Sequence, residues 1–220
     1  MHLIRTQLAL GIFGEGGRAA LINLGIAAVT YAVSLIYDPL NHGPYRLFLR
    51  TPIDDAIPVI TAFVIPYVSL RPFLYGSLVL FLLFRARVFR SAALSMITVF
   101  VVSYLFYFFL QSFIERPTLT GDDMLTAMIR EVYAGDQPFN DFPSLHASLS
   151  TLVAMHWLHT SRRIGAMVAI WAALIVVSTV FVKQHYVADM VAGAGLAYVV
   201  SRFMLARVAS RPASVGPAPA

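Results

Sequence analysis

The sequence predicts an all-α membrane protein with six transmembrane helices. Of the 220 residues, 59% are hydrophobic and only 12% are charged, whereas a soluble domain carries about a quarter charged residues. The apolar residues gather in six runs, and a helix needs roughly 20 such residues to cross a bilayer. Cysteine is absent, so the chain has no disulfide, no thiolate nucleophile and no cysteine-bound metal.

The six runs define the expected helices, which in chain order are residues 19–37, 57–84, 91–113, 144–160, 164–182 and 187–206. The fourth run is short. The second is overlong and contains Arg71 and three prolines, Pro58, Pro66 and Pro72, so we expect it to begin outside the bilayer or to kink. In the last run, the Ala-Gly-Ala-Gly stretch at 192–195 favours a close helix-packing surface.

Three regions follow from these runs. We expect residues 1–18 to form a cytoplasmic or interfacial N-terminal segment and residues 19–206 to form the six-helix transmembrane catalytic domain. The remaining residues, 207–220, are rich in proline and alanine, which predicts a disordered cytoplasmic tail.

The charges predict how the bundle is oriented. With six spans, ten of the sixteen Lys and Arg residues share the side of the termini with a single acid, Glu15, and the other ten acids lie opposite. The positive-inside rule then places both termini in the cytoplasm and the loop 114–143 outside. We therefore expect an integral protein of the plasma membrane, of the bacterial inner-membrane type, whose site faces the periplasm or exterior. The arginines are scattered, which argues against nucleic acid as a partner.

His185 and Asp189 form the first chemical signal, at the start of the last apolar run. On a helix, residues four apart share one face, so the aspartate can accept a hydrogen bond from one imidazole nitrogen and leave the other free to attack. The structural alternative is an interfacial pair that caps a helix. Ionisable groups at the edge of a bilayer are costly, which favours the functional interpretation.

Ser144 and His146 form the second signal, at the start of the fourth run. Proline followed by serine is a helix-start pattern, and the free N–H groups of a helix N-terminus favour a phosphate. His146 lies in the first turn and, as an imidazolium, could protonate a leaving alkoxide. A serine cap with a histidine at the headgroup level is the structural alternative.

Arg116 and Lys183 supply positive charge near these two motifs. Arginine can contact a phosphate at two points, and Lys183 could be a second phosphate ligand or a snorkelling lysine. The alternative of a metal bound by His146, His185 and Asp189 is disfavoured, because neighbouring cations would repel it. We therefore expect an anion site without a metal or other cofactor.

The order of these motifs resembles the type 2 phosphatidic acid phosphatase superfamily, which comprises lipid phosphate phosphatases and phosphotransferases. The resemblance covers about residues 105–200 and consists of Arg116-Pro117, Pro143-Ser144-x-His146 and His185-x-x-x-Asp189. It implies that His185 is the nucleophile, that Asp189 orients it and that His146 is the acid for the leaving group. It also implies that Arg116 and Ser144 bind the phosphate, and that a membrane lipid phosphate is cleaved through a phosphohistidine without a metal.

The chain departs from the family pattern at three positions. Phe109 stands where a lysine is common, Thr179 stands where an arginine is common, and Leu145 replaces a glycine. These features resemble the branch that includes the inositol phosphorylceramide and sphingomyelin synthases, which transfer a phospho-headgroup between lipids. The acceptor, water or another lipid, is therefore open, as are the lipid and the oligomeric state.

Two alternatives of another kind remain at this stage. Arg71, inside an apolar run, favours a small transporter with a polar path across the bilayer. The absent cations favour a relative that binds a lipid phosphate without turning it over.

Overall fold

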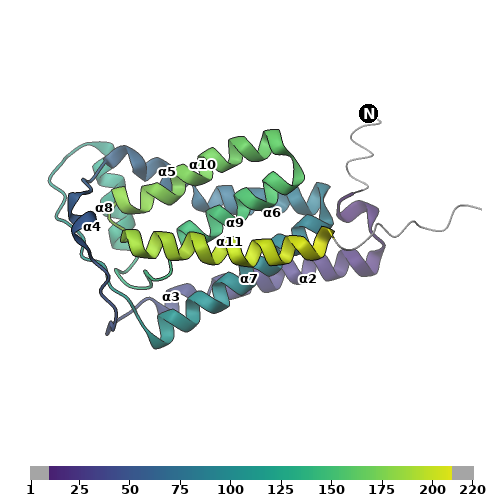
Figure 1. Cartoon of the computed structure of the whole chain (residues 1–220), viewed down its shortest axis with the longest axis horizontal. Coiled ribbons are helices and arrows are strands. Elements are labelled where there is room, and N and C mark those ends of the chain that lie inside the picture. Colours follow the sequence, from purple (N-terminus) through teal and green to yellow (C-terminus); the bar gives the residue numbers. More distant parts are fainter. Residues whose placement is uncertain (1–9, 210–220) are drawn as a thin grey trace, which may run out of the picture.

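The computed structural model describes residues 10–209 and is built from helices (Figure 1). No β-strand occurs in this range; two isolated bridges, Leu47 with Ser112 and Phe113 with Phe139, are the nearest approach to one. The all-α prediction is therefore confirmed. Half of the expected N-terminal segment, residues 1–9, and most of the expected tail, residues 210–220, lie outside the described residues.

The long helices match the six apolar runs. They are α2 (Gly17–Ser34), α6 (Leu70–Phe84), α7 (Ala86–Phe109), α9 (Leu145–Thr160), α10 (Arg162–Phe181) and α11 (Val187–Ala209). Shorter helical segments lie between them, namely η1 (Ile12–Gly14), α3 (Tyr37–Leu40), α4 (Pro52–Ala56), η2 (Thr61–Phe63), α5 (Val64–Val68) and α8 (Met124–Gly135).

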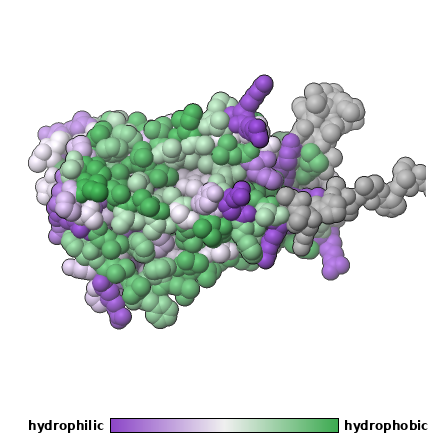
Figure 2. All heavy atoms as spheres, in the orientation of Figure 1, coloured by the Kyte–Doolittle hydropathy of each residue, from purple (hydrophilic) through white to green (hydrophobic). Residues whose placement is uncertain are grey.

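Within residues 10–209, five helical stretches are long and apolar enough to cross a membrane, namely Gly17–Leu40, Thr61–Phe84, Ala86–Phe109, Arg162–Phe181 and Val187–Val208. The sixth expected span, α9, has only 16 residues. On the face shown in Figure 2, apolar side chains cover most of the length of the bundle and polar side chains gather toward its two ends. The chain thus has the surface of an integral membrane protein, while the count of six spans and its orientation in the cell stay predictions.

The second run is broken, as its prolines indicated. Residues 57–60 are not helical, the helix starts at Thr61, and α5 and α6 meet at Ser69. The Ser69 hydroxyl donates to the carbonyl oxygen of Pro66 at 2.7 Å, close to the point where proline interrupts the regular hydrogen-bond pattern.

Helix α9 is the centre of the bundle, because it packs against α7, α10 and α11. The core between these helices includes Met96, Val99, Leu152, Ile175 and Ala197. Turns join α6 to α7 and α9 to α10 at one end of the bundle. The long connections 110–144 and 182–186 gather at the other end, together with α4, α5 and α8 (Figure 1).

Helix α8 was not expected from the sequence, which was interpreted as a loop over residues 114–143. Its N-cap is Asp123, whose Oδ1 accepts from the backbone N–H groups of Leu125 and Thr126. Ile129 on its inner face packs in a small cluster with Tyr67 of α5 and Val182. Helix α8 therefore covers the end of the bundle where the two histidine motifs meet.

Candidate active site

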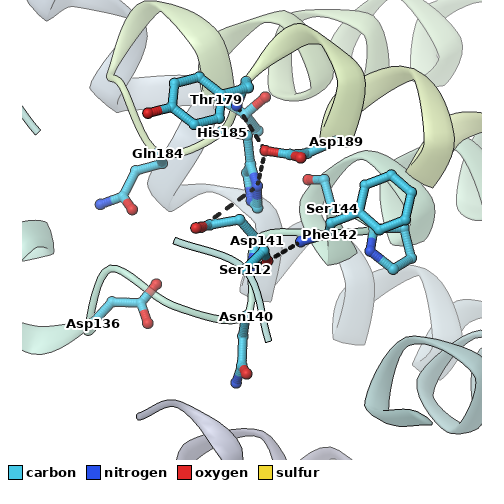
Figure 3. Close-up of polar contacts among 12 residues, drawn as sticks. Ser112, Asp136, Asn140, Asp141, Phe142, Ser144, Thr179, Gln184, His185 and Asp189 are labelled. Carbon is cyan, nitrogen blue, oxygen red and sulfur yellow. Dashed lines mark hydrogen bonds and ion pairs between the residues drawn. The ribbon is translucent and has the colours of Figure 1, made fainter. Parts of the chain in front are cut away.

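His185 and Asp189 lie together, although they do not share a helical turn as their spacing suggested. His185 precedes α11, and its backbone N–H donates to the carbonyl oxygen of Thr179 at 3.1 Å. The N–H of Tyr186 donates to Asp189 Oδ2 at 2.8 Å. These bonds place His185 Nδ1 3.9 Å from Asp189 Oδ2 (Figure 3).

Asp141 is a second carboxylate beside the same imidazole, and the motifs did not reveal it. Its Oδ1 lies 3.9 Å from His185 Nδ1 on the other side (Figure 3). The loop is held by Ser112, whose Oγ accepts from the N–H groups of Asp141 at 2.8 Å and Phe142 at 2.7 Å. The available signal was the position of Asp141 directly before the Phe-Pro-Ser segment that starts α9.

His146 approaches His185 from α9. The two ring centroids are 6.2 Å apart and the rings are tilted by 55°. The other face of the His146 ring stacks on Tyr67 of α5, with centroids 4.2 Å apart and an interplanar angle of 14°. Three separate elements thus fix the distance between the two histidines.

Ser144 joins α9 to α11. Its Oγ caps α9 by accepting from the N–H of Ala147 at 3.3 Å, which confirms the predicted helix start. Its own N–H donates to the backbone carbonyl of Asp189 at 3.1 Å. The helices approach so closely that a Cβ on Gly193 would lie 2.3 Å from the Ser144 carbonyl oxygen. The predicted small-residue packing surface is therefore confirmed at Gly193.

Arg116 is bound to the protein through both terminal nitrogens of its guanidinium. Nη1 donates to the carbonyl oxygens of Tyr133 (3.1 Å) and Asp136 (2.7 Å). Nη2 donates to the carbonyl oxygen of Gln137 (3.3 Å) and to Oε1 of Gln184 (2.6 Å). Arg116 therefore ties the end of α8 to the α10–α11 connection, and Nε, which is buried, has no partner within residues 10–209.

Lys183 points away from the histidines. Its Nζ donates to the carbonyl oxygens of Asp54 at 2.7 Å and Ile57 at 2.5 Å. Asp54 in turn accepts, through Oδ1, from the N–H of Val187 at 2.8 Å. Burial lowers the pKa of Lys183, an effect that Asp54 opposes. The ammonium thus holds the end of α4 against the start of α11.

Burial dominates the electrostatics at His185. It lowers the pKa of that imidazole, and the nearby His146 and Arg116 add to the effect. Burial also raises the pKa of Asp141, and Asp189 raises it further. Both shifts favour the neutral forms of the two groups.

Several buried polar atoms at this site have no hydrogen-bond partner among the residues described. They are Arg116 Nε, Asp141 Oδ2, Gln184 Nε2, His185 Nδ1 and Asp189 Oδ1. Buried polar groups are usually paired, so a concentration of unpaired donors and acceptors indicates a place where a polar ligand binds. Over residues 10–209, no group of three or more His, Asp or Glu side chains has an arrangement that could hold a metal ion.

A match to a known family identifies the class to which this protein belongs. The model of the PAP2 superfamily matches residues 92–212, which is more than half of the chain and includes both histidine motifs and Arg116. The chain belongs to the PAP2 superfamily. Members of this superfamily are generally phosphatases and phosphotransferases. Searches of curated proteins and of solved structures found no match.

Two of the three departures from the PAP2 pattern have a clear structural setting. Phe109 ends α7 and is 58% exposed, so no cation reaches the site from this position. Thr179 is buried, and its hydroxyl donates to the carbonyl oxygen of Val176 at 2.7 Å. A phosphate at this site must find its positive partners elsewhere in the chain.

Proposed function

We propose that this PAP2 protein transfers the phosphoryl group of a membrane lipid phosphate through a covalent intermediate on His185. The observation that carries the proposal is the setting of Nδ1, which has a carboxylate oxygen 3.9 Å away on each side. In this proposal the Asp189 carboxylate accepts a hydrogen bond from Nδ1–H, which selects the tautomer in which Nε2 bears the lone pair. Asp189 is the orienting residue, and Asp141, whose raised pKa favours its neutral form, lies on the other side of Nδ1.

The reaction has two displacements at phosphorus. In the first, Nε2 of His185 forms a bond to phosphorus while the bond from phosphorus to the lipid oxygen breaks, and His146 gives its proton to that oxygen. In the second, neutral His146 accepts a proton from water or a lipid hydroxyl as its oxygen attacks phosphorus and releases His185. No metal or cofactor takes part in this proposal.

Phosphate binding falls to the start of α9 and to Arg116. The free N–H groups at the α9 N-terminus and the hydroxyl of Ser144 can donate to phosphate oxygens, and Arg116 has its Nε–H to offer. Lys183 does not bind the phosphate directly in this proposal. Its ammonium donates to two carbonyl oxygens and fixes the segment that carries His185.

The proposal is tested with purified protein and a panel of lipid phosphates, by measuring free phosphate and transfer to a lipid alcohol in parallel. We expect His185→Ala to lower turnover by at least about 10³-fold, with the protein still folded and inserted. His159→Ala is the matched control, since His159 lies at the other end of α9. Full activity of His185→Ala on every substrate that the wild type accepts would contradict the mechanism.

The same assay identifies the acceptor. Release of inorganic phosphate alone indicates a phosphatase. Transfer of the phospho-headgroup of a phosphodiester lipid, added to the panel, to a lipid alcohol in preference to water indicates a headgroup transferase of the inositol phosphorylceramide synthase type, which the missing cations at Phe109 and Thr179 first suggested.

A further inference from the structure

Arg71 is a charged residue in an apolar helix, and residues 10–209 offer it no carboxylate to neutralise it. It stands in the first turn of α6, within the membrane-spanning stretch Thr61–Phe84, and its side chain is exposed. Within residues 10–209 it makes neither a hydrogen bond nor an ion pair. A guanidinium inside an apolar stretch is costly unless it reaches water or an anion, and the described part of the chain supplies Arg71 with no anionic partner.

Two observations place Arg71 in the neighbourhood of His146. Tyr67 lies one helical turn earlier and stacks on the His146 ring, and residues four apart share a helix face. Ser69, between them, faces α10, where its Oγ accepts from Trp171 Nε1 at 3.0 Å. The guanidinium of Arg71 is also near enough to His146 to act electrostatically on its imidazole. An anion bound by Arg71 would therefore lie near the proposed acid.

An apolar groove begins on α6 below Arg71. Tyr75, Leu78 and Leu82 follow Arg71 at spacings of four, three and four residues, so all four lie on the same face of α6. These three residues line a cavity of about 140 Å³ together with Ala27 and Tyr31 of α2, and its exposed lining is apolar. Helix α2 packs chiefly against α7, which leaves this groove open beside α6.

We infer that the α2–α6 groove binds the hydrocarbon chain of the lipid phosphate and that Arg71 binds its phosphate beside His146. The residues along this face of α6 match the parts of a lipid phosphate. The cation, Arg71, lies at the end near His146, where the phosphate would bind, and apolar side chains follow it along the groove, where the hydrocarbon chain would bind. Arg71 would supply a positive charge that Phe109 and Thr179 do not. This inference rests on the proposed function, since it names where the substrate of that reaction is held.

Photocrosslinking tests the groove without requiring turnover. The probe is an alkyl phosphate with a diazirine in its chain, bound to the full-length protein in nanodiscs, and labelled residues are mapped by mass spectrometry. We expect labels at Tyr31, Tyr75 and Leu82. Unlabelled alkyl phosphate should reduce them at least fivefold, whereas the same alcohol without phosphate should not.

Matched variants separate the chain site from the phosphate site. Ala27→Phe should fill the groove and reduce labelling severalfold, whereas Ala28→Phe, on the exposed side of α2, should not. Arg71→Gln should remove the advantage of the phosphate over the alcohol, Arg71→Lys should keep part of it, and Arg46→Gln, another exposed arginine, should keep all of it.

Two results would overturn the inference. One is labelling that the alcohol competes as well as the phosphate does, which would indicate an ordinary bilayer lipid in the groove. The other is unchanged, phosphate-selective labelling in Arg71→Gln. Both are distinguishable from failure of the proposed function, because the crosslinking is repeated in His185→Ala, where we expect the same pattern without catalysis.

Discussion

The ring of His146 lies flat against the ring of Tyr67, with centroids 4.2 Å apart and planes inclined by only 14°. Tyr67 belongs to α5, far from α9 in the sequence, and is buried. The stack restrains the rotation of the imidazole that we propose as the proton donor. The position of the acid thus depends on a residue outside the segment that matches the PAP2 model.

Replacing Tyr67 should therefore affect catalysis through His146. An aromatic stack is worth about 0.5–1.5 kcal/mol, so we expect Tyr67→Leu to lower kcat roughly three- to tenfold. Tyr67→Phe retains the stack and should stay within about twofold of the wild type. Steady-state kinetics on the best lipid phosphate check this, and equal losses in the two variants would show that the hydroxyl, rather than the stack, matters.

Close packing between α9 and α11 gives a second prediction. A Cβ on Gly193 would lie 2.3 Å from the carbonyl oxygen of Ser144, so Gly193→Ala should cost about 1–3 kcal/mol and lower kcat as His146 moves from His185. Gly195→Ala is the control, because a Cβ there has nothing within 4 Å and should be neutral or stabilising by up to about 1 kcal/mol. Thermal unfolding in detergent measures both, and a fully stable, active Gly193→Ala would contradict this close approach.

The pKa of His185 gives a third prediction. Burial, with His146 and Arg116, lowers this pKa below its ordinary value of 6.5, so the imidazole keeps its reactive lone pair as the pH falls through that value. The acidic limb of the kcat/KM profile should therefore lie below pH 6.5. The contradicting result is an acidic limb at or above pH 6.5 that is lost on replacement of His185. It would show that His185 is not a buried, neutral nucleophile.

The pH dependence of stability tests the environment of Asp141. Burial, followed by Asp189, raises its pKa in the folded protein. A carboxyl with a raised pKa stabilises the fold most fully below its unfolded value and loses that contribution as the pH rises through the folded value. Asp141→Asn cannot ionise, so its Tm should rise relative to the wild type between pH 5 and pH 8, by about 2–4 °C per kcal/mol. A constant difference across this range would contradict the raised pKa.

The sequence predicts the scaffold well because apolar length is a strong local signal. Six runs marked the long helices, and the prolines marked the break before Leu70. Helix α8 was not predicted, although its sequence carries a helical signal. Apolar residues recur there at spacings of three and four and pack into one small cluster, namely Leu125, Met128, Ile129, Val132 and Tyr133.

The candidate site could be predicted in part, because several of its residues belong to motifs that are local in the sequence. His146, His185 and Asp189 belong to compact motifs, and their proximity agrees with those motifs. Asp141 joins them only through the loop that Ser112 holds. The acceptors that engage Arg116 and Lys183 are mostly backbone carbonyl oxygens, which residue identity cannot reveal.

The stereochemical course at phosphorus tests the central claim most directly. A substrate made chiral at phosphorus with oxygen isotopes or sulfur is converted to product by the wild-type protein, and the configuration of the product is determined by phosphorus NMR. Each in-line displacement inverts phosphorus, so attack by His185 followed by attack of the acceptor predicts net retention. Net inversion would show a single displacement, with no phosphohistidine on His185.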